Sequence, residues 1–162
     1  MADQQPGDAP EPEHDEHELI LVGIDFSPWA IRAFVTAREL ALERHAELLV
    51  VHVMEIENLD EIASVAGISA PLLRERLESE RRARLSEVVR TASGNGGTVT
   101  TTEVVAWGHP FEQLLKRAAE FAADLIVLGV AGRSADLQRA LFGGTAEHVL
   151  RGATCPVLCV PS

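Results

Sequence analysis

The sequence predicts an α/β protein with a single doubly wound domain: a five-stranded parallel sheet of order 3-2-1-4-5 with helices on both faces. Two observations lead to this fold class. Strand-like and helix-like segments alternate from residue 18 to the end of the chain, as in parallel sheets with helical crossovers. The central strand-like segments are also continuously apolar, which is typical of strands buried on both faces. With 162 residues, the chain is long enough for one ordinary core.

The first half of the chain contains two apolar strand segments. We expect the first strand over residues 18–25 (ELILVGID), followed by a helix with Ser27 as its N-cap and Pro28 at its first position. A second strand is expected over residues 47–54 (ELLVVHVM). Residues 55–70 mix acids, glycine and scattered apolar residues, so we expect an irregular connection there.

The second half continues the alternation. Residues 98–107 (TVTTTEVVAW) are β-branched and half polar, which predicts an edge strand. The arginines and glutamates of the preceding segment alternate at helical spacing, as on a solvated helix face. The remaining elements are expected as helices over 71–93 and 110–122, a buried strand over 125–128, a short helix over 146–151 and a last strand over 156–160.

Charge and composition limit which classes of function are possible. The net charge is −11, and residues 1–17 are acidic and proline-rich, so we expect a disordered tail there and one folded domain over 18–162. A mildly acidic domain without a basic stripe argues against nucleic-acid binding. Neither a signal peptide nor an apolar run of membrane-spanning length is evident, which predicts a cytoplasmic protein without a membrane partner. Cys155 and Cys159 are interpreted as small core residues in a reducing compartment.

A glycine-rich stretch follows the fourth strand. Gly129 and Gly132 end that strand, Arg133 comes next, and Gly143-Gly144-Thr145 precedes the short helix. Glycines let a backbone approach a ligand closely, and a helix N-terminus offers free N–H groups and a positive dipole end. The Thr145 hydroxyl and the Arg133 guanidinium add donors for an anion. This stretch therefore predicts a phosphate-binding loop.

Asp25 ends the first strand. Ligands of open α/β sheets bind at the carboxyl ends of the strands, where the winding reverses, so neighbouring first and fourth strands would place Asp25 beside Gly129. Its carboxylate can accept hydrogen bonds from a sugar or a base, or it can cap the next helix together with Ser27, and the sequence leaves both uses open. Among the histidines, His52 is expected in the core and His109 near the site; His148 is expected to face outward. His109 is therefore a weaker candidate for ligand contact, and His52 and His148 are not expected to contact a ligand.

Three segments carry a resemblance to a known family. The segments ILVGIDFS, LLVVHV and DLIVLGVAGRS…LFGGTAEHVLRGATCPVLCV resemble the universal stress protein family, an adenine-nucleotide-binding α/β family, over residues 18–160. The resemblance implies ATP as the ligand, with AMP, ADP and cyclic AMP as alternatives, and Mg²⁺ only as a companion of the nucleotide. It also implies that Asp25 contacts the ribose or adenine, that the Val53 backbone reads the adenine edge, and that glycines wrap the phosphates. The candidate cofactor-binding residues are Gly23, Asp25, Val53, Leu128, Gly129, Gly132, Arg133, Gly143, Gly144 and Thr145.

The glycine loop departs from the pattern of the family's ATP-binding members in two ways. That pattern is G-x-x-G, nine residues, G, then Ser or Thr. Here ten residues separate Gly132 from Gly143, and Gly144 stands where the family has Ser or Thr. An extra residue in a loop costs little, and Thr145 is one position away from the missing hydroxyl.

Three functions remain open. The first is a stress-response regulatory protein that binds an adenine nucleotide, and the second is a dimeric interaction or chaperone-like module of the same fold without nucleotide. The third, a slow nucleotide hydrolase, is disfavoured because we find no nucleophile–base pair, Walker-type loop or acidic magnesium cluster. The resemblance and the apolar last strand at an edge predict a homodimer through that strand. We further expect Gly129→Val or Gly143→Val to abolish ATP binding without unfolding the domain.

Overall fold

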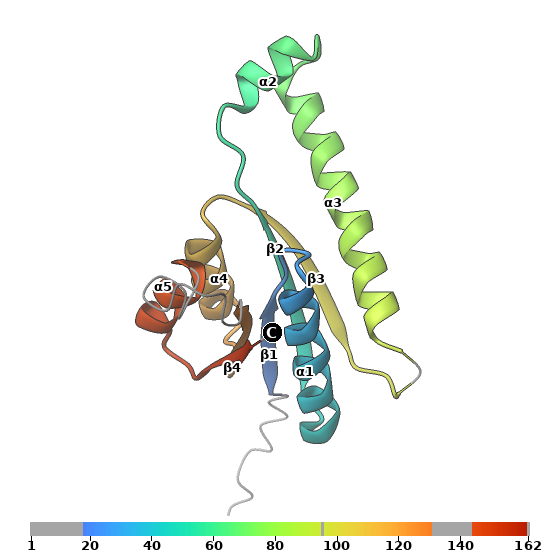
Figure 1. The fold of residues 1–162 in the computed structure, drawn as a ribbon, viewed down its shortest axis with the longest axis vertical. Helices are drawn as coiled ribbons and strands as arrows, with labels where there is room; N and C mark the ends of the chain where they lie inside the picture. The colour runs from blue at the N-terminus through green and yellow to red at the C-terminus, as the bar shows by residue number, and fades with distance from the viewer. Residues whose placement is uncertain (1–17, 95, 131–143, 162) are drawn as a thin grey trace, which may run out of the picture.

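The sheet has the predicted order. Figure 1 shows the computed structural model of the chain, which describes residues 18–94, 96–130 and 144–161. Five strands form one sheet of order β3-β2-β1-β4-β5, and every pairing is parallel. β3 and β5 are its two edges, which confirms the edge position predicted for the half-polar third strand. The strands are β1 (Leu19–Gly23), β2 (Glu47–Met54), β3 (Thr101–Trp107), β4 (Leu125–Val130) and β5 (Val157–Pro161).

Helices connect the strands on both faces. They are α1 (Pro28–Arg44), α2 (Leu59–Val65), α3 (Ala70–Ala92), α4 (Pro110–Glu120) and α5 (Gly144–Gly152). As predicted, Pro28 occupies the first turn of α1, and the side-chain oxygen of the N-cap Ser27 accepts a hydrogen bond from the backbone N–H of Ala30 at 3.2 Å. This contact satisfies one of the helix-end donors that have no partner within the helix.

The expectation of an irregular connection over residues 55–70 is wrong, because α2 forms within it. α2 has seven residues, with Asp60 and Glu61 in its first turn, where carboxylates interact favourably with the helix dipole. Its one buried residue, Ala63, is 2% exposed, and α2 packs against α3. A helix this short is marginal by itself. Its formation is therefore decided by the packing against α3, which local pattern does not reveal.

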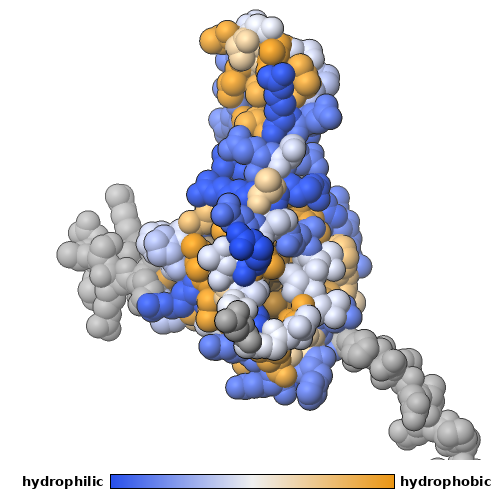
Figure 2. Space-filling view, turned by 90° about the vertical axis from the view of Figure 1, so that its right-hand side faces the viewer, coloured by the Kyte–Doolittle hydropathy of each residue, from blue (hydrophilic) through white to orange (hydrophobic). Residues whose placement is uncertain are grey.

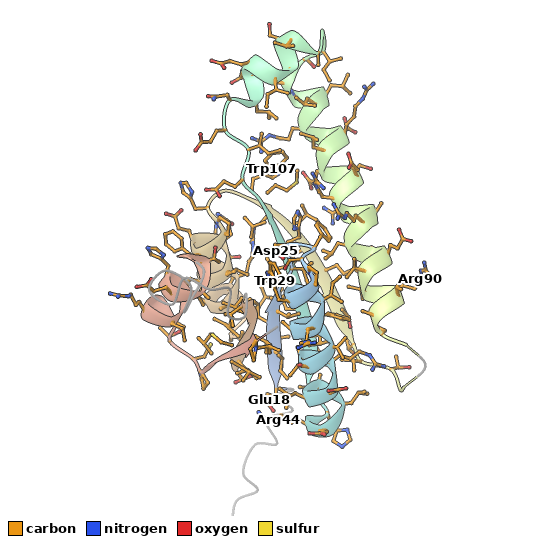
Figure 3. The ribbon with its side chains drawn as sticks, in the orientation of Figure 1. Glu18, Asp25, Trp29, Arg44, Arg90 and Trp107 are labelled. Atoms are coloured by element: carbon orange, nitrogen blue, oxygen red, sulfur yellow. The ribbon has the colours of Figure 1, made fainter. Side chains whose placement is uncertain are left out.

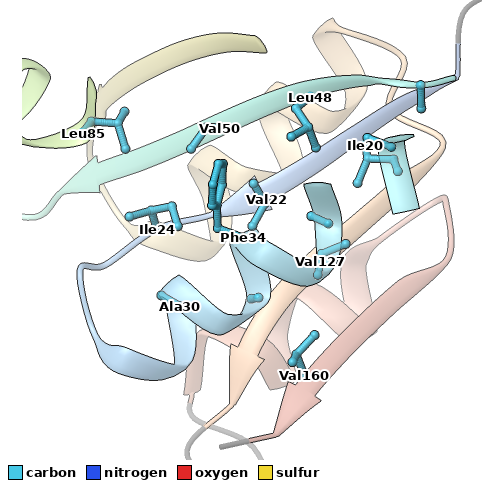
Figure 4. Close-up of a cluster of buried hydrophobic side chains, with 14 residues drawn as sticks. Ile20, Val22, Ile24, Ala30, Phe34, Leu48, Val50, Leu85, Val127 and Val160 are labelled. Carbon is cyan, nitrogen blue, oxygen red and sulfur yellow. The ribbon is translucent and has the colours of Figure 1, made fainter. Parts of the chain in front are cut away.

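The core lies on both faces of the sheet, and side chains alternate between them along each central strand. In β1, Ile20 and Val22 face α1 and α3, whereas Leu21 faces α4 and α5, and all three are fully buried. Figure 4 shows the first of these clusters, with the Phe34 ring of α1 beside Val22. The continuous apolar runs in the sequence thus reflect strands covered by helices on both sides.

α2 and the first half of α3 form an arm, residues 59–80, that extends beyond the carboxyl end of the sheet (Figure 1). Figure 2 shows apolar side chains gathered at the far end of this arm, where Ile62, Val65 and Leu72 are 46%, 91% and 38% exposed. The second half of α3 returns to the sheet, where Leu85 is fully buried in the core. No helix in the described part of the chain is long and apolar enough to cross a bilayer.

Candidate functional site

The adjacency of β1 and β4 creates the predicted site geometry. Ile20 pairs with Leu125 and Val22 with Val127, so the two strands end side by side. A cavity of about 200 Å³ opens at their carboxyl ends. Six of the predicted site residues line it: Gly23, Asp25, Val53, Leu128, Gly129 and Thr145. Asp25 and Gly129, more than a hundred positions apart in the sequence, therefore share one cavity, as expected for this strand order.

The other four predicted site residues are not placed in the cavity. Gly144 is described as the first residue of α5 but is not among the cavity-lining residues. Gly132, Arg133 and Gly143 lie outside the described residues, and so does the ten-residue spacing between the two glycines. Phosphate binding by the glycine-rich loop thus remains a prediction. The predicted residues at the ends of β1 and β4, in contrast, have a defined geometry.

Three helices begin at the cavity wall. Ala30 in the first turn of α1, Pro110 at the start of α4, and Thr145 with Ala146 in the first turn of α5 all line it. A helix N-terminus carries a partial positive charge and backbone N–H groups without helical partners. The cavity therefore has a positive electrostatic contribution from the backbone, although no Lys or Arg is among its described lining residues.

Asp25 is held by the residue that caps α1. Its Oδ1 atom accepts hydrogen bonds from the backbone N–H of Ser27 at 2.9 Å and from the Ser27 hydroxyl at 2.5 Å. Ser27 in turn caps α1, so the helix-capping use considered from the sequence is present. Asp25, labelled in Figure 3, is exposed, and none of the hydrogen bonds between described residues uses its second oxygen, Oδ2. Capping and ligand contact can therefore coexist.

Gly129 has a packing role that the sequence did not reveal. A Cβ atom at this position would lie 2.4 Å from the Trp29 carbonyl oxygen and 2.7 Å from the Ala30 backbone nitrogen. These are backbone atoms of the first turn of α1 and cannot rotate away. The expectation that Gly129→Val would leave the domain folded is therefore wrong, because the added side chain would push β4 and α1 apart.

Most of the apolar cavity wall was missed by sequence reasoning. Ile24 contributes from directly after β1, Val51 from β2 and Leu114 from α4. Leu114 is 4% exposed and also belongs to the core between the sheet and α4. Its helical spacing with other apolar residues of the segment 110–122 indicates a core position, which is correct, but does not show that the same side chain reaches the site.

The three histidines considered from the sequence as possible ligands occupy different environments. His52 is 8% exposed, as expected for a core residue, and its Nδ1 lies 2.7 Å from the Ile24 carbonyl oxygen. His109 precedes α4 but does not line the cavity; its Nδ1 lies 2.5 Å from Glu55 Oε1, and this hydrogen bond raises the pKa of His109. His148 is exposed, as predicted. Within the described segments, no three His, Cys, Asp or Glu residues are grouped so that they could hold a metal ion.

Comparison with known families agrees with this architecture. The model of the universal stress protein family matches residues 17–161. The chain belongs to the universal stress protein family. Universal stress protein MJ0531 of Methanocaldococcus jannaschii is 31% identical over 144 residues, covering 89% of this chain and 82% of that protein. A universal stress protein of Thermus aquaticus is 34% identical over 144 residues, covering 88% and 98% of the two chains.

Solved structures of universal stress proteins share the fold. The protein MJ0577 superimposes with a TM-score of 0.70 at 20% identity, covering 90% of this chain and 96% of that one. A universal stress protein in complex with cAMP gives a TM-score of 0.58 at 20% identity, with 90% and 97% coverage. A universal stress protein of Archaeoglobus fulgidus in complex with dAMP gives 0.58 at 21% identity, with 89% and 98% coverage.

Proposed function

We propose that this chain is a stress-response regulatory protein that binds an adenine nucleotide, ATP in the first place, at the carboxyl ends of β1 and β4. The observation that carries the proposal is the cavity shared by Asp25 and Gly129, onto which the N-termini of α1, α4 and α5 converge. Solved relatives of the same fold are complexes with cAMP and dAMP, which supports an adenine nucleotide as the ligand class.

The two sides of the cavity suit different parts of a nucleotide. Val51, Val53 and Leu114 offer apolar surface for a flat base, while the Asp25 carboxylate can accept a hydrogen bond from a ribose hydroxyl or an adenine amine. The Thr145 hydroxyl and the first N–H groups of α5 can donate to phosphate oxygens. Ligand pockets typically measure about 300–1,000 Å³. At about 200 Å³, the described cavity would enclose the nucleoside part, with the phosphates extending outside it.

Isothermal titration of the full chain with ATP, ADP, AMP and cyclic AMP tests this proposal. We expect saturable heat, with ATP the tightest ligand; Mg²⁺, added in parallel titrations, would act through the phosphates. Thr145→Val removes the phosphate donor while keeping the shape of the side chain, and should weaken ATP binding about three- to tenfold. Thr145→Ser keeps the hydroxyl and is the matched control. Absence of heat with all four nucleotides would refute the proposal.

The alternative function is an interaction module that does not bind nucleotide. The exposed apolar end of the arm, with Val65 91% exposed, is the observation that favours it. If none of the four nucleotides gives heat in the titration, this function becomes the favoured one. Val65→Lys should then reduce the association of the arm with its protein partner. Slow hydrolysis of a bound nucleotide is the least favoured function, because Asp25 is the one carboxylate among the described cavity-lining residues and none of these is a histidine.

We also propose a homodimer formed through β5. β5 ends the sheet order, and no described strand pairs with its outer edge; its residues Val157, Leu158 and Cys159 are only partly buried. Light scattering of the full chain should give twice the 17.5 kDa mass of one chain. Cys159→Lys should shift the mass to that of a monomer, because charge on an edge strand opposes pairing. Thr102→Lys, on the opposite edge strand β3, should leave the dimer intact. A monomeric parent protein would refute the dimer.

We further propose that the protein is located in the cytoplasm. Cys155 and Cys159 are free thiols, and burial raises the pKa of both, which makes them poorly reactive. Two unpaired cysteines suit a reducing compartment. Cell fractionation tests the location directly: recovery of the protein outside the cytoplasmic fraction would contradict it.

A further inference from the structure

The loop that carries Asp25 has an unusual backbone at the next residue. Phe26 has a φ of 66°, in the left-handed region that favours glycine. A residue with a Cβ atom adopts this conformation at a conformational cost, and such a conformation persists only where surrounding contacts enforce it. The contacts that enforce it here come from two other elements of the fold.

The Phe26 ring contacts two side chains from other elements, and we call Phe26, His52 and Arg84 together the clamp. The His52 ring of β2 has its centroid 4.4 Å from that of Phe26, at an interplanar angle of 44°. The Arg84 guanidinium of α3 lies 4.2 Å from the Phe26 ring centroid, which is the geometry of a cation–π contact. The ring thus contacts both the sheet and α3.

The residue before Asp25 is fixed as well. Ile24 donates its backbone N–H to the Val51 carbonyl oxygen at 2.8 Å, and its own carbonyl oxygen lies 2.7 Å from Nδ1 of His52. His52 is thereby in contact with both neighbours of Asp25. Burial lowers the pKa of His52, and the nearby Arg81 and Arg84 lower it further. The neutral imidazole then carries its proton on Nδ1 and donates it to the Ile24 carbonyl.

We propose that His52, Phe26 and Arg84 are positioning residues that hold the Asp25 carboxylate toward the cavity, so that α3 influences ligand affinity through Arg84. This inference rests on the proposed nucleotide function, because Asp25 is the group through which the clamp would act on a ligand. None of the three clamp residues lines the cavity, so their effect would pass through the loop. If the clamp were released, a smaller fraction of molecules would present Asp25 correctly, and the apparent affinity would fall by that fraction.

Arg84→Gln tests the clamp, because it removes the cation and keeps a long polar side chain. We expect ATP binding to weaken roughly two- to fivefold, as for the loss of one exposed cation–π contact. Arg84→Lys keeps a cation over the ring and should restore most of the affinity. Arg90→Gln is the matched control on the same helix, since the one ion pair of Arg90 among the described residues is with Glu87 and its side chain points away from the sheet in Figure 3.

A double-mutant cycle separates positioning from general stabilisation. If Arg84 acts through Asp25, Arg84→Gln should weaken binding in the parent protein but have no further effect in the Asp25→Ala background. An equal effect in both backgrounds would overturn the proposal, and so would an unchanged affinity in the parent background. Thermal unfolding of each variant confirms that the comparison is made between folded proteins.

Hydrogen exchange of the Ser27 amide provides a second measurement that needs no nucleotide. This amide donates to Asp25 Oδ1 at 2.9 Å, so it reports the position of the carboxylate. Arg84→Gln should accelerate its exchange, whereas Arg90→Gln should not. If the parent protein binds no nucleotide, the proposed function fails and this exchange rate alone decides the clamp. Unchanged Ser27 exchange in Arg84→Gln would show that the clamp does not hold Asp25.

Discussion

Gly129 at the end of β4 lies directly against the backbone of Trp29, the residue in the first turn of α1 that Figure 3 labels. The close approach brings the N-terminus of α1 to the carboxyl ends of β1 and β4, where the cavity opens. One glycine therefore serves both the packing of a helix on the sheet and the geometry of the site. A variant of Gly129 cannot test ligand binding independently of stability.

We predict that Gly129→Val destabilises the domain by several kcal/mol, and Gly129→Ala by roughly 1–3 kcal/mol, because each added atom would overlap backbone that cannot move aside. Urea denaturation followed by circular dichroism measures the change in unfolding free energy. Gly144→Ala is the control, because no atom of the described residues beyond its chain neighbours and its own helix turn lies within 4 Å of an added Cβ there. Equal stability of Gly129→Val and the parent protein would contradict the packing role.

Asp25→Ala should weaken ATP binding about tenfold or more, as expected for a lost hydrogen bond to a charged group. The rate of any hydrolysis per bound nucleotide should not change, because Asp25 is expected to bind the ligand rather than to react. Calorimetry gives the affinity, and phosphate release at saturating ATP gives the turnover. Asp25→Asn keeps an oxygen that can accept from Ser27 and serves as the control for the cap. A large loss of turnover at saturation would instead give Asp25 a catalytic role.

Protonation of His52 should make the domain less stable in acid. The pKa of His52 is lowered from its ordinary value of 6.5, chiefly by burial. The unfolded chain therefore binds this proton at a higher pH than the folded protein does. The contribution of neutral His52 to stability is fully present above about pH 6.5 and is lost as the pH falls toward the folded-state pKa.

His52→Gln removes this titration, so its unfolding free energy should fall less between pH 7 and pH 5 than that of the parent protein. Urea denaturation at both pH values measures the difference, in which the titration of all other groups cancels. An identical pH dependence of His52→Gln and the parent would show that His52 does not titrate differently in the folded state.

Leu85 anchors α3 to the sheet. It is fully buried, and we predict that Leu85→Ala lowers the unfolding free energy by about 2–5 kcal/mol through lost apolar burial and the cavity left behind. Leu72 lies on the arm of the same helix and is 38% exposed. Leu72→Ala should therefore cost much less, within about 1 kcal/mol. Similar losses at the two positions would mean that the arm contributes to the core as much as the rest of α3 does.

The family resemblance and the residue patterns together predicted the fold closely, but they predicted the site only in part. Ser27 and Pro28 marked the start of α1 through a capping pattern that depends on neighbouring residues alone. Asp25 and Thr145, which line the cavity, were predicted as ligand-binding residues from their positions at a strand end and a helix start. Leu114 was missed as a cavity residue, because its spacing indicates only that it faces inward and not which strand end it reaches.

The sequence by itself determined the alternation of strands and helices, the burial of β1, β2 and β4 on both faces, and the glycine and acidic residues at the strand ends. These properties follow from local patterns with periods of a few residues. The tertiary structure alone decided that α2 forms, that Gly129 is needed for backbone contact with Trp29, and that Arg84 and His52 both contact the Phe26 ring. Each of these depends on distances between segments far apart in the chain, which no local pattern specifies.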